Sequence, residues 1–137
     1  MSLYAFRVAA LVSAALITGC QSTSVTEMWA SARPATDNEK SAIIDGMRDA
    51  LHDPYSVRDV EISEVITATL GGIVHQVCVR GNAKNAYGGY TGRETYLLYM
   101  NNAAQVTHVK QGPAMNTVCP RLKFSPFPEA VERLQKL

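Results

Sequence analysis

The stretch Ile73-Val74-His75-Gln76-Val77-Cys78-Val79-Arg80 decides the fold, because it predicts a β-strand more strongly than any other part of the chain. Half of its residues are β-branched, and such side chains suit the pleated surface of a sheet. Glycines lie directly before it, at Gly71 and Gly72, and favour a turn there. We therefore predict a strand over residues 73–80.

Three further strands are predicted on either side of this segment. Residues 57–67 form the first, and the turn at 69–72 leads into the strand over residues 73–80. Residues 94–100 form the third, and a turn at 101–104 leads into the fourth, over residues 105–110. Connections this short favour antiparallel neighbours, so the simplest arrangement is an antiparallel meander of about four strands.

Two amphipathic helices are predicted at the ends of the domain. Residues 37–52 begin at a capping box, in which Thr36 and Glu39 satisfy each other's free backbone amides. A second helix over residues 129–136 follows two prolines. Helices can cover an apolar sheet face, so the fold class is α+β, with both helices packed on the sheet in a single domain over residues 37–137.

The N-terminus has the pattern of a cleaved export signal. Arg7 precedes an uncharged apolar run over residues 8–17 that is shorter than the ~20 residues of a membrane-spanning helix. The run closes on Leu16-Ile17-Thr18-Gly19-Cys20, which resembles the lipobox of bacterial lipoproteins. This resemblance implies a signal peptide over residues 1–19 and a covalent lipid on Cys20, although a secretory peptide with a chance cysteine is the alternative.

The lipid would fix the protein to a membrane, since two or more acyl chains anchor a protein stably. Gln21 follows the cysteine, and among enterobacterial lipoproteins this favours the outer membrane, so we expect a cell-envelope protein that faces the periplasm. Residues 20–36 are rich in Ser, Thr and Ala and predict a flexible tether. Met28 and Trp29 are unusual in a linker and either dock on the domain or lie at the membrane interface.

Charge limits the class of partner. The chain has 13 basic and 12 acidic residues, and the predicted leader contains one basic residue, Arg7, and no acid. The mature chain is therefore neutral, and its sequence has no basic cluster. Both facts argue against a nucleic-acid partner and leave the lipid anchor, an envelope protein or peptidoglycan as the expected contacts.

The cysteine count becomes even once Cys20 carries lipid. Cys78 and Cys119 remain, and an oxidising periplasm favours a disulfide between them. The bond would close a loop of about 40 residues and contribute ~4 kcal/mol on the chain-entropy estimate. Two free buried thiols or a metal site are the alternatives.

Residues 81–92 form an unusual connection between strands, Gly-Asn-Ala-Lys-Asn-Ala-Tyr-Gly-Gly-Tyr-Thr-Gly. Glycines permit positive φ, asparagines bond their own backbone, and tyrosines can cap the end of a sheet, so the segment can be purely structural. Tyrosine and amide side chains on a glycine-rich loop also suit a glycan or peptide ligand. The candidate binding residues are Asn82, Lys84, Asn85, Tyr87 and Tyr90.

This segment carries a second resemblance. Asn82 to Asn85, followed by Tyr87 to Gly92, is similar to a segment of small bacterial envelope proteins and lipoproteins, in which it follows a strand that carries a cysteine. An upstream Asp-Pro-x-Ser, here Asp53 to Ser56, belongs to the same pattern. The resemblance covers roughly residues 50–120, and it implies a shared domain but no particular chemistry.

No catalytic or metal-binding motif accompanies these features. His75 and Cys78 are three apart on a predicted strand and point to opposite faces, and the sequence has no nucleophile elbow, phosphate loop or dinucleotide fingerprint. We therefore expect no metal and no cofactor apart from the lipid on Cys20. The leading hypothesis is a non-catalytic structural or interaction module, the second a peptidoglycan- or glycan-binding module, and the third an enzyme whose site has no known motif.

Overall fold

The structure, a computed structural model, describes residues 23–69, 71–112, 115 and 117–136. The predicted leader and Cys20 lie outside these residues. The elements are, in chain order, α1 (Val25–Ala30), α2 (Asp37–Ala50), β1 (Asp53–Ser63), β2 (Ile66–Thr69), β3 (Ile73–Lys84), β4 (Glu94–Met100), β5 (Val106–Gln111), the 3₁₀ turn η2 (Cys119–Arg121), β6 (Phe124–Pro126) and α3 (Pro128–Leu134).

Strand β3, which contains the predicted strand over residues 73–80, lies at the centre of one antiparallel sheet. The strand order is β5-β4-β3-β1-β6, and β2 also pairs with β3. The meander through β3, β4 and β5 is confirmed, and β4 has the predicted bounds. β3 is longer than predicted, because it continues through Gly81 to Lys84. The α+β class is therefore confirmed.

The prediction of about four strands is wrong, because the sheet has six. The predicted first strand is interrupted at Glu64 and Val65, where the backbone turns to other partners: Glu64 donates to the carbonyl of Lys123, and Val65 pairs with Arg33. β1 and β2 lie end to end along β3 on either side of this break. β6 is only three residues long, which is too short to produce a recognisable pattern.

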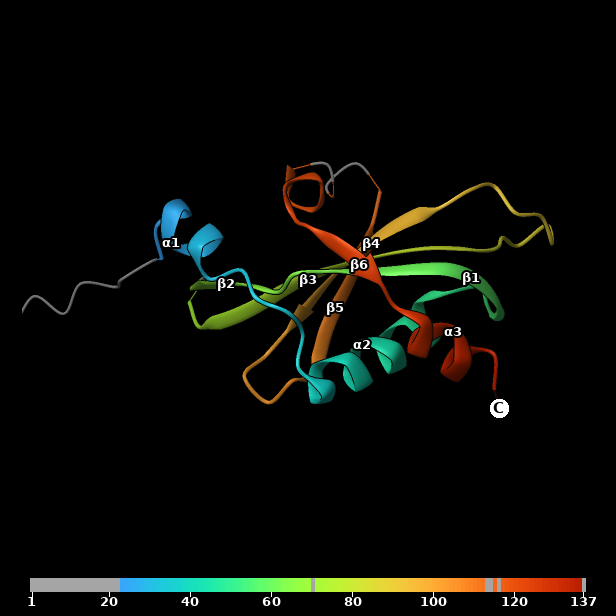
Figure 1. The fold of residues 1–137 in the computed structure, drawn as a ribbon, viewed down its shortest axis with the longest axis horizontal. Helices are drawn as coiled ribbons and strands as arrows, with labels where there is room; N and C mark the ends of the chain where they lie inside the picture. Colours follow the sequence, from blue (N-terminus) through green and yellow to red (C-terminus); the bar gives the residue numbers. More distant parts are fainter. Residues whose placement is uncertain (1–22, 70, 113–114, 116, 137) are drawn as a thin grey trace, which may run out of the picture.

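Each face of the sheet contributes buried side chains to a separate core. Helices α2 and α3 lie along one face, hereafter the helix side, over Val77, Val79 and Leu98. The segment that contains η2 crosses the other face, the disulfide side, over Cys78 and Leu97 (Figure 1). Strict alternation along β3 and β4 therefore assigns neighbouring side chains to different cores.

The capping box at the start of α2 is present as predicted. The Thr36 hydroxyl accepts from the Glu39 backbone, and the Glu39 carboxylate accepts from the Thr36 backbone at 2.8 Å. The helix ends at Ala50, two residues before the predicted end, and α3 begins at Pro128. Both helices pack on the sheet, as expected.

Residues 23–36 correct the expectation of a flexible tether. Val25–Ala30 form a short helix with its own capping box between Ser24 and Glu27. Trp29 packs against the core on the disulfide side, and the Thr23 hydroxyl bonds the Thr69 hydroxyl at 2.6 Å. Of the two alternatives for Met28 and Trp29, docking on the domain is the one observed. A composition rich in Ser, Thr and Ala does not indicate that these two apolar side chains pack on the domain.

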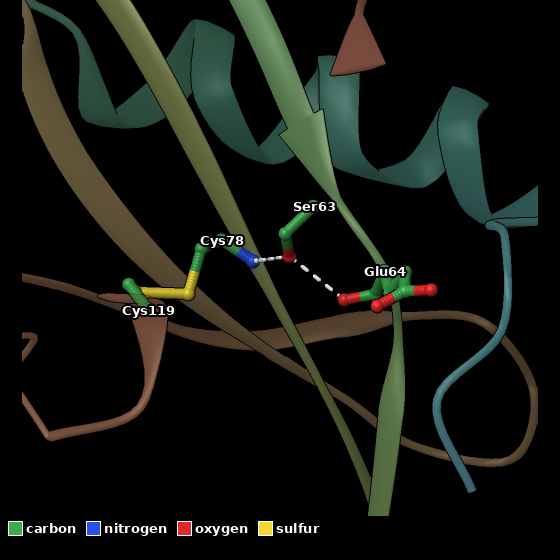
Figure 2. Close-up of a disulfide and its surroundings, with 4 residues drawn as sticks. All are labelled: Ser63, Glu64, Cys78 and Cys119. Atoms are coloured by element: carbon green, nitrogen blue, oxygen red, sulfur yellow. Dashed lines mark hydrogen bonds between the residues drawn. A yellow bond between two sulfur atoms is a disulfide. The ribbon is translucent and has the colours of Figure 1, made fainter. Parts of the chain in front are cut away.

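The predicted disulfide between Cys78 and Cys119 is present, with its Cα atoms 5.7 Å apart. It joins the central strand to the segment between β5 and β6, and both cysteines are buried. Figure 2 shows its immediate support: the Ser63 hydroxyl accepts from the Cys78 backbone at 2.8 Å and donates to the Glu64 carbonyl at 2.7 Å. The bond thus lies where β1 breaks.

Candidate functional site

The glycine-rich segment divides into a strand and a loop. Asn82 and Lys84 belong to the end of β3, while residues 85–93 form the connection to β4. Asn85 organises this loop, because its side-chain oxygen accepts from the backbones of Tyr87 and Gly89. Gly88 has φ of 77°, a conformation that favours glycine. The structural reading of Asn85 is thus supported.

The two loop tyrosines have opposite environments. Tyr87 is 96% exposed, and no contact of its ring is present among the described residues. Tyr90 folds back on β1, where its hydroxyl donates to the Ser56 carbonyl at 2.8 Å. Its backbone pairs with Lys84, so the loop closes on the end of β3. Tyr90 therefore belongs to the fold, whereas Tyr87 is free to meet a ligand.

The Asp-Pro-x-Ser segment at residues 53–56 and the glycine-rich segment at residues 81–92 meet at Ser56. Its hydroxyl donates to the Asp53 carbonyl and accepts from the Lys84 backbone, each at 2.8 Å. Its own carbonyl accepts the Tyr90 hydroxyl. The Asp-Pro-x-Ser segment and the glycine-rich segment thus form one structural unit at one end of the sheet.

Beside this unit lies a part of the disulfide side that the η2 segment leaves uncovered. We call it the open face and define it by the side chains of Arg58, Glu61, Arg80, Asn82, Lys84 and Arg93, with the ring of Tyr90. All are partly or fully exposed to solvent. Four are cations and one is a carboxylate, so this surface is strongly basic although the chain as a whole has 13 basic and 12 acidic residues.

A bulge in β1 produces this gathering of charge. Asp59 has φ of 53°, and the register between β1 and β3 shifts between Arg58 and Glu61. Simple alternation would place residues three apart on opposite faces, but the extra residue brings Arg58 and Glu61 to the same face, opposite Asn82 and Arg80 respectively.

Aromatic rings hold two of the guanidinium groups. The Arg58 guanidinium carbon lies 3.8 Å from the centroid of the Tyr90 ring, and that of Arg80 lies 3.6 Å from the centroid of Phe124. The Lys84 ammonium lies 5.9 Å from the Tyr90 ring. Such cation–π contacts restrict long side chains that would otherwise be mobile.

Glu61 binds two arginines at once. Its Oε2 lies 3.0 Å from Arg80 and 2.9 Å from Arg93. Arg80 Nε and Asn82 Oδ1 are buried and make no hydrogen bond in the described protein. A hollow of about 170 Å³ borders Arg80, between Phe124 and the disulfide segment. The Arg80 Nε and Asn82 Oδ1 atoms are covered by protein, so the donors that a ligand can reach on the open face belong to the exposed side chains of Arg58 and Arg93.

Sequence reasoning found Asn82, Lys84 and Tyr90 of this surface but missed four important members, namely Arg58, Glu61, Arg80 and Arg93. Arg80 and Arg93 flank the glycine-rich segment, so their proximity was a usable signal. Arg58 and Glu61 carry no such signal, because they are brought there by the bulge.

The described residues contain no group of three or more His, Cys, Asp and Glu side chains placed to hold a metal ion. His75 instead bonds Thr67 and Asn102 through its two ring nitrogens. None of the helices described is both long and apolar enough to cross a membrane.

Comparison with protein-family models, with curated proteins and with solved structures found no match. The chemistry of the open face is therefore inferred from its own residues alone.

Proposed function

We propose that the protein is a non-catalytic interaction module of the bacterial cell envelope, anchored by lipid on Cys20, and that it holds a partner on the open face and the adjacent loop. The observation that carries the proposal is a basic sheet surface, stiffened by aromatic rings, beside a tyrosine that is 96% exposed. Aromatic and arginine side chains are the residues enriched where proteins bind each other.

The position of α1 supports an orientation in which the open face points away from the membrane. Thr23 lies beside Thr69 at one end of the β2–β3 pair, and the open face lies toward the opposite end of β3. Only three peptide units separate Cys20 from Thr23, a reach of at most about 11 Å. β3 itself spans roughly 35 Å at the usual rise per residue. A lipid on Cys20 would therefore hold the α1 end near the membrane and present the loop away from it (Figure 1).

A glycan-binding module is the second candidate, and the exposed Tyr87 ring is the observation that favours it. The other rings of this surface are less suited to sugars, because Arg58 already covers a face of Tyr90 and Arg80 covers a face of Phe124. For this reason we place a protein of the envelope before peptidoglycan as the partner. An outer-membrane location facing the periplasm remains the proposed setting.

Photo-crosslinking in cells tests the proposal directly. A photoreactive residue at Tyr87 should give a discrete product with another protein, whereas the same residue at the exposed Glu132 on α3 should not. Binding of the purified protein to isolated peptidoglycan, without a protein product, would favour the second candidate. Absence of both results would overturn the assignment of this surface.

A further inference from the structure

The open face has four cations and one carboxylate, Glu61, and Asp53, the register partner of Lys84 in β1, forms no ion pair with Lys84 among the described residues. Glu61 pairs with Arg80 and Arg93, so Arg58 and Lys84 remain. Within the described residues, neither side chain of these two makes a hydrogen bond or an ion pair. Their common neighbour is the Tyr90 ring, which is itself fixed to Ser56.

Arg58 is held in a form suited to carboxylates. A guanidinium group that lies flat on a ring keeps its N–H donors at its edge, where they can bind a carboxylate through two parallel hydrogen bonds. Tyr90 restricts the side chain in advance, so less conformational entropy is lost when a ligand binds. A sugar hydroxyl would use this fork poorly.

Glu61 shows how such a ligand is bound. It is a carboxylate held by two arginines, and each arginine has five donors, most of which this single group leaves unused. The internal carboxylate therefore occupies part of a surface that accepts carboxylates.

An anionic membrane surface is less compatible with the geometry than a peptide, for two reasons. The membrane that carries the lipid would lie toward α1, away from this surface. An anionic lipid headgroup also needs cations that reach outward, whereas Arg58 and Arg80 lie back against rings. An extended peptide can instead lie along a flat sheet surface and place successive acidic side chains on it.

We propose that the open face binds an extended acidic peptide segment of an envelope protein, with Arg58 and Lys84 as the principal contacts. Glu61 competes with the acidic side chains of the partner for Arg80 and Arg93. The inference rests on the proposed function, to which it adds the chemical class of the partner.

The test uses the full-length lipidated protein in neutral detergent and a fluorescent ten-residue peptide of alternating Glu and Gly. Fluorescence anisotropy should show binding that weakens as salt rises, and the matched Gln-Gly peptide should not bind. Arg58→Ala should weaken binding about tenfold or more, as expected for a lost charge-assisted hydrogen bond. Lys84→Ala removes a cation that lies farther from the Tyr90 ring, at 5.9 Å, and it should also weaken binding, so it provides a second variant should Arg58→Ala lower the melting temperature.

Two variants make the test specific. Arg121→Ala removes an arginine that lies 5.2 Å from the Trp29 ring, outside the open face, and should leave peptide affinity unchanged. Glu61→Gln removes the competing carboxylate and should tighten peptide binding several-fold. Equal loss in Arg121→Ala, or no tightening in Glu61→Gln, would contradict the assignment of the site.

Other outcomes separate this inference from the proposed function. A Tyr87 crosslink that forms equally well in Arg58→Ala, together with no binding of the Glu-Gly peptide, would overturn the acidic-peptide proposal and leave the interaction module intact. Vesicles that contain phosphatidylglycerol, if they compete better than the peptide at equal charge, would overturn it in favour of a lipid surface. Loss of both the crosslink and peptide binding would overturn the two proposals together.

Discussion

Tyr90 donates its phenolic hydroxyl to the backbone carbonyl of Ser56 at 2.8 Å, which ties the tip of the glycine-rich loop to the first strand of the sheet. Tyr87, three residues earlier, makes no comparable contact and is almost entirely exposed. One loop thus contains a tyrosine that belongs to the fold and a tyrosine that is free.

The first prediction follows from this contrast. Tyr90→Phe should lower the free energy of unfolding by about 1 kcal/mol, because it removes a hydrogen bond, and Tyr90→Ala should cost more because Arg58 also loses its ring. Tyr87→Ala should leave stability unchanged. Thermal unfolding of the three purified variants measures both effects, and an equal loss at the two tyrosines would refute the division.

The second prediction concerns the disulfide. Cys78→Ala and Cys119→Ala should destabilise the protein by similar amounts, up to about 4 kcal/mol, because each removes the same cross-link. The double variant should be about as stable as the less stable of the two single variants, since the two residues share one bond. Chemical denaturation curves measure this, and additive losses would show that the cysteines act separately.

The third prediction concerns Glu39, which receives both arms of the Arg33 guanidinium at 2.8 and 2.7 Å and is 6% exposed. Hydrogen bonds from Arg33 lower the pKa of Glu39 from 4.5 to about 2, and those from Thr36 act in the same direction. Glu39→Gln should therefore reduce stability at pH 7 by about 2 kcal/mol.

The loss of stability caused by Glu39→Gln should depend on pH. Because the pKa of Glu39 is lower in the folded than in the unfolded protein, its stabilising contribution is complete above pH 4.5 and is lost as the pH falls toward 2. The difference in stability between the natural protein and Glu39→Gln should shrink across this window. Asp37→Asn, at an exposed carboxylate of the same helix turn, provides the control. A difference that stays constant down to pH 2 would contradict the role of the ionised carboxylate.

The fourth prediction concerns the anchor. Cys20→Ala should abolish incorporation of labelled palmitate and either release soluble protein or leave an uncleaved precursor. Fractionation of cells that express the variant measures this. Lipid labelling that persists in Cys20→Ala would disprove the lipobox assignment, whereas Cys78→Ala should retain the label.

Much of the fold could be predicted from local patterns. Residues 73–80 and 94–100 are rich in residues that favour strands, and the Thr36–Glu39 capping box marks the start of α2. Such signals arise from neighbouring residues, so a single sequence contains them. The Cys78–Cys119 pair was predictable for a different reason: with Cys20 assigned to lipid, the two cysteines left in the sequence have only one possible pairing.

The features that escaped prediction depend on contacts between distant segments. β6 forms because Phe124–Pro126 meet β1, and α1 is held because Trp29 reaches the core on the disulfide side. The open face requires the bulge at Asp59, whose positive φ is uncommon for a residue other than glycine. Regular alternation along a strand would place Arg58 and Glu61 on opposite faces, so a sequence pattern alone could not predict that they lie on the same face.

The Cys78–Cys119 bond has one further consequence, because residues 85–93 lie inside the covalent ring that it closes. A protease that cut the loop beside Tyr87 would leave two fragments that remain joined by sulfur, and β3 and β4 would still be paired along their length. Such a nicked molecule would migrate as one chain until it was reduced. The exposed loop can therefore be cut without release of the sheet on which it is displayed.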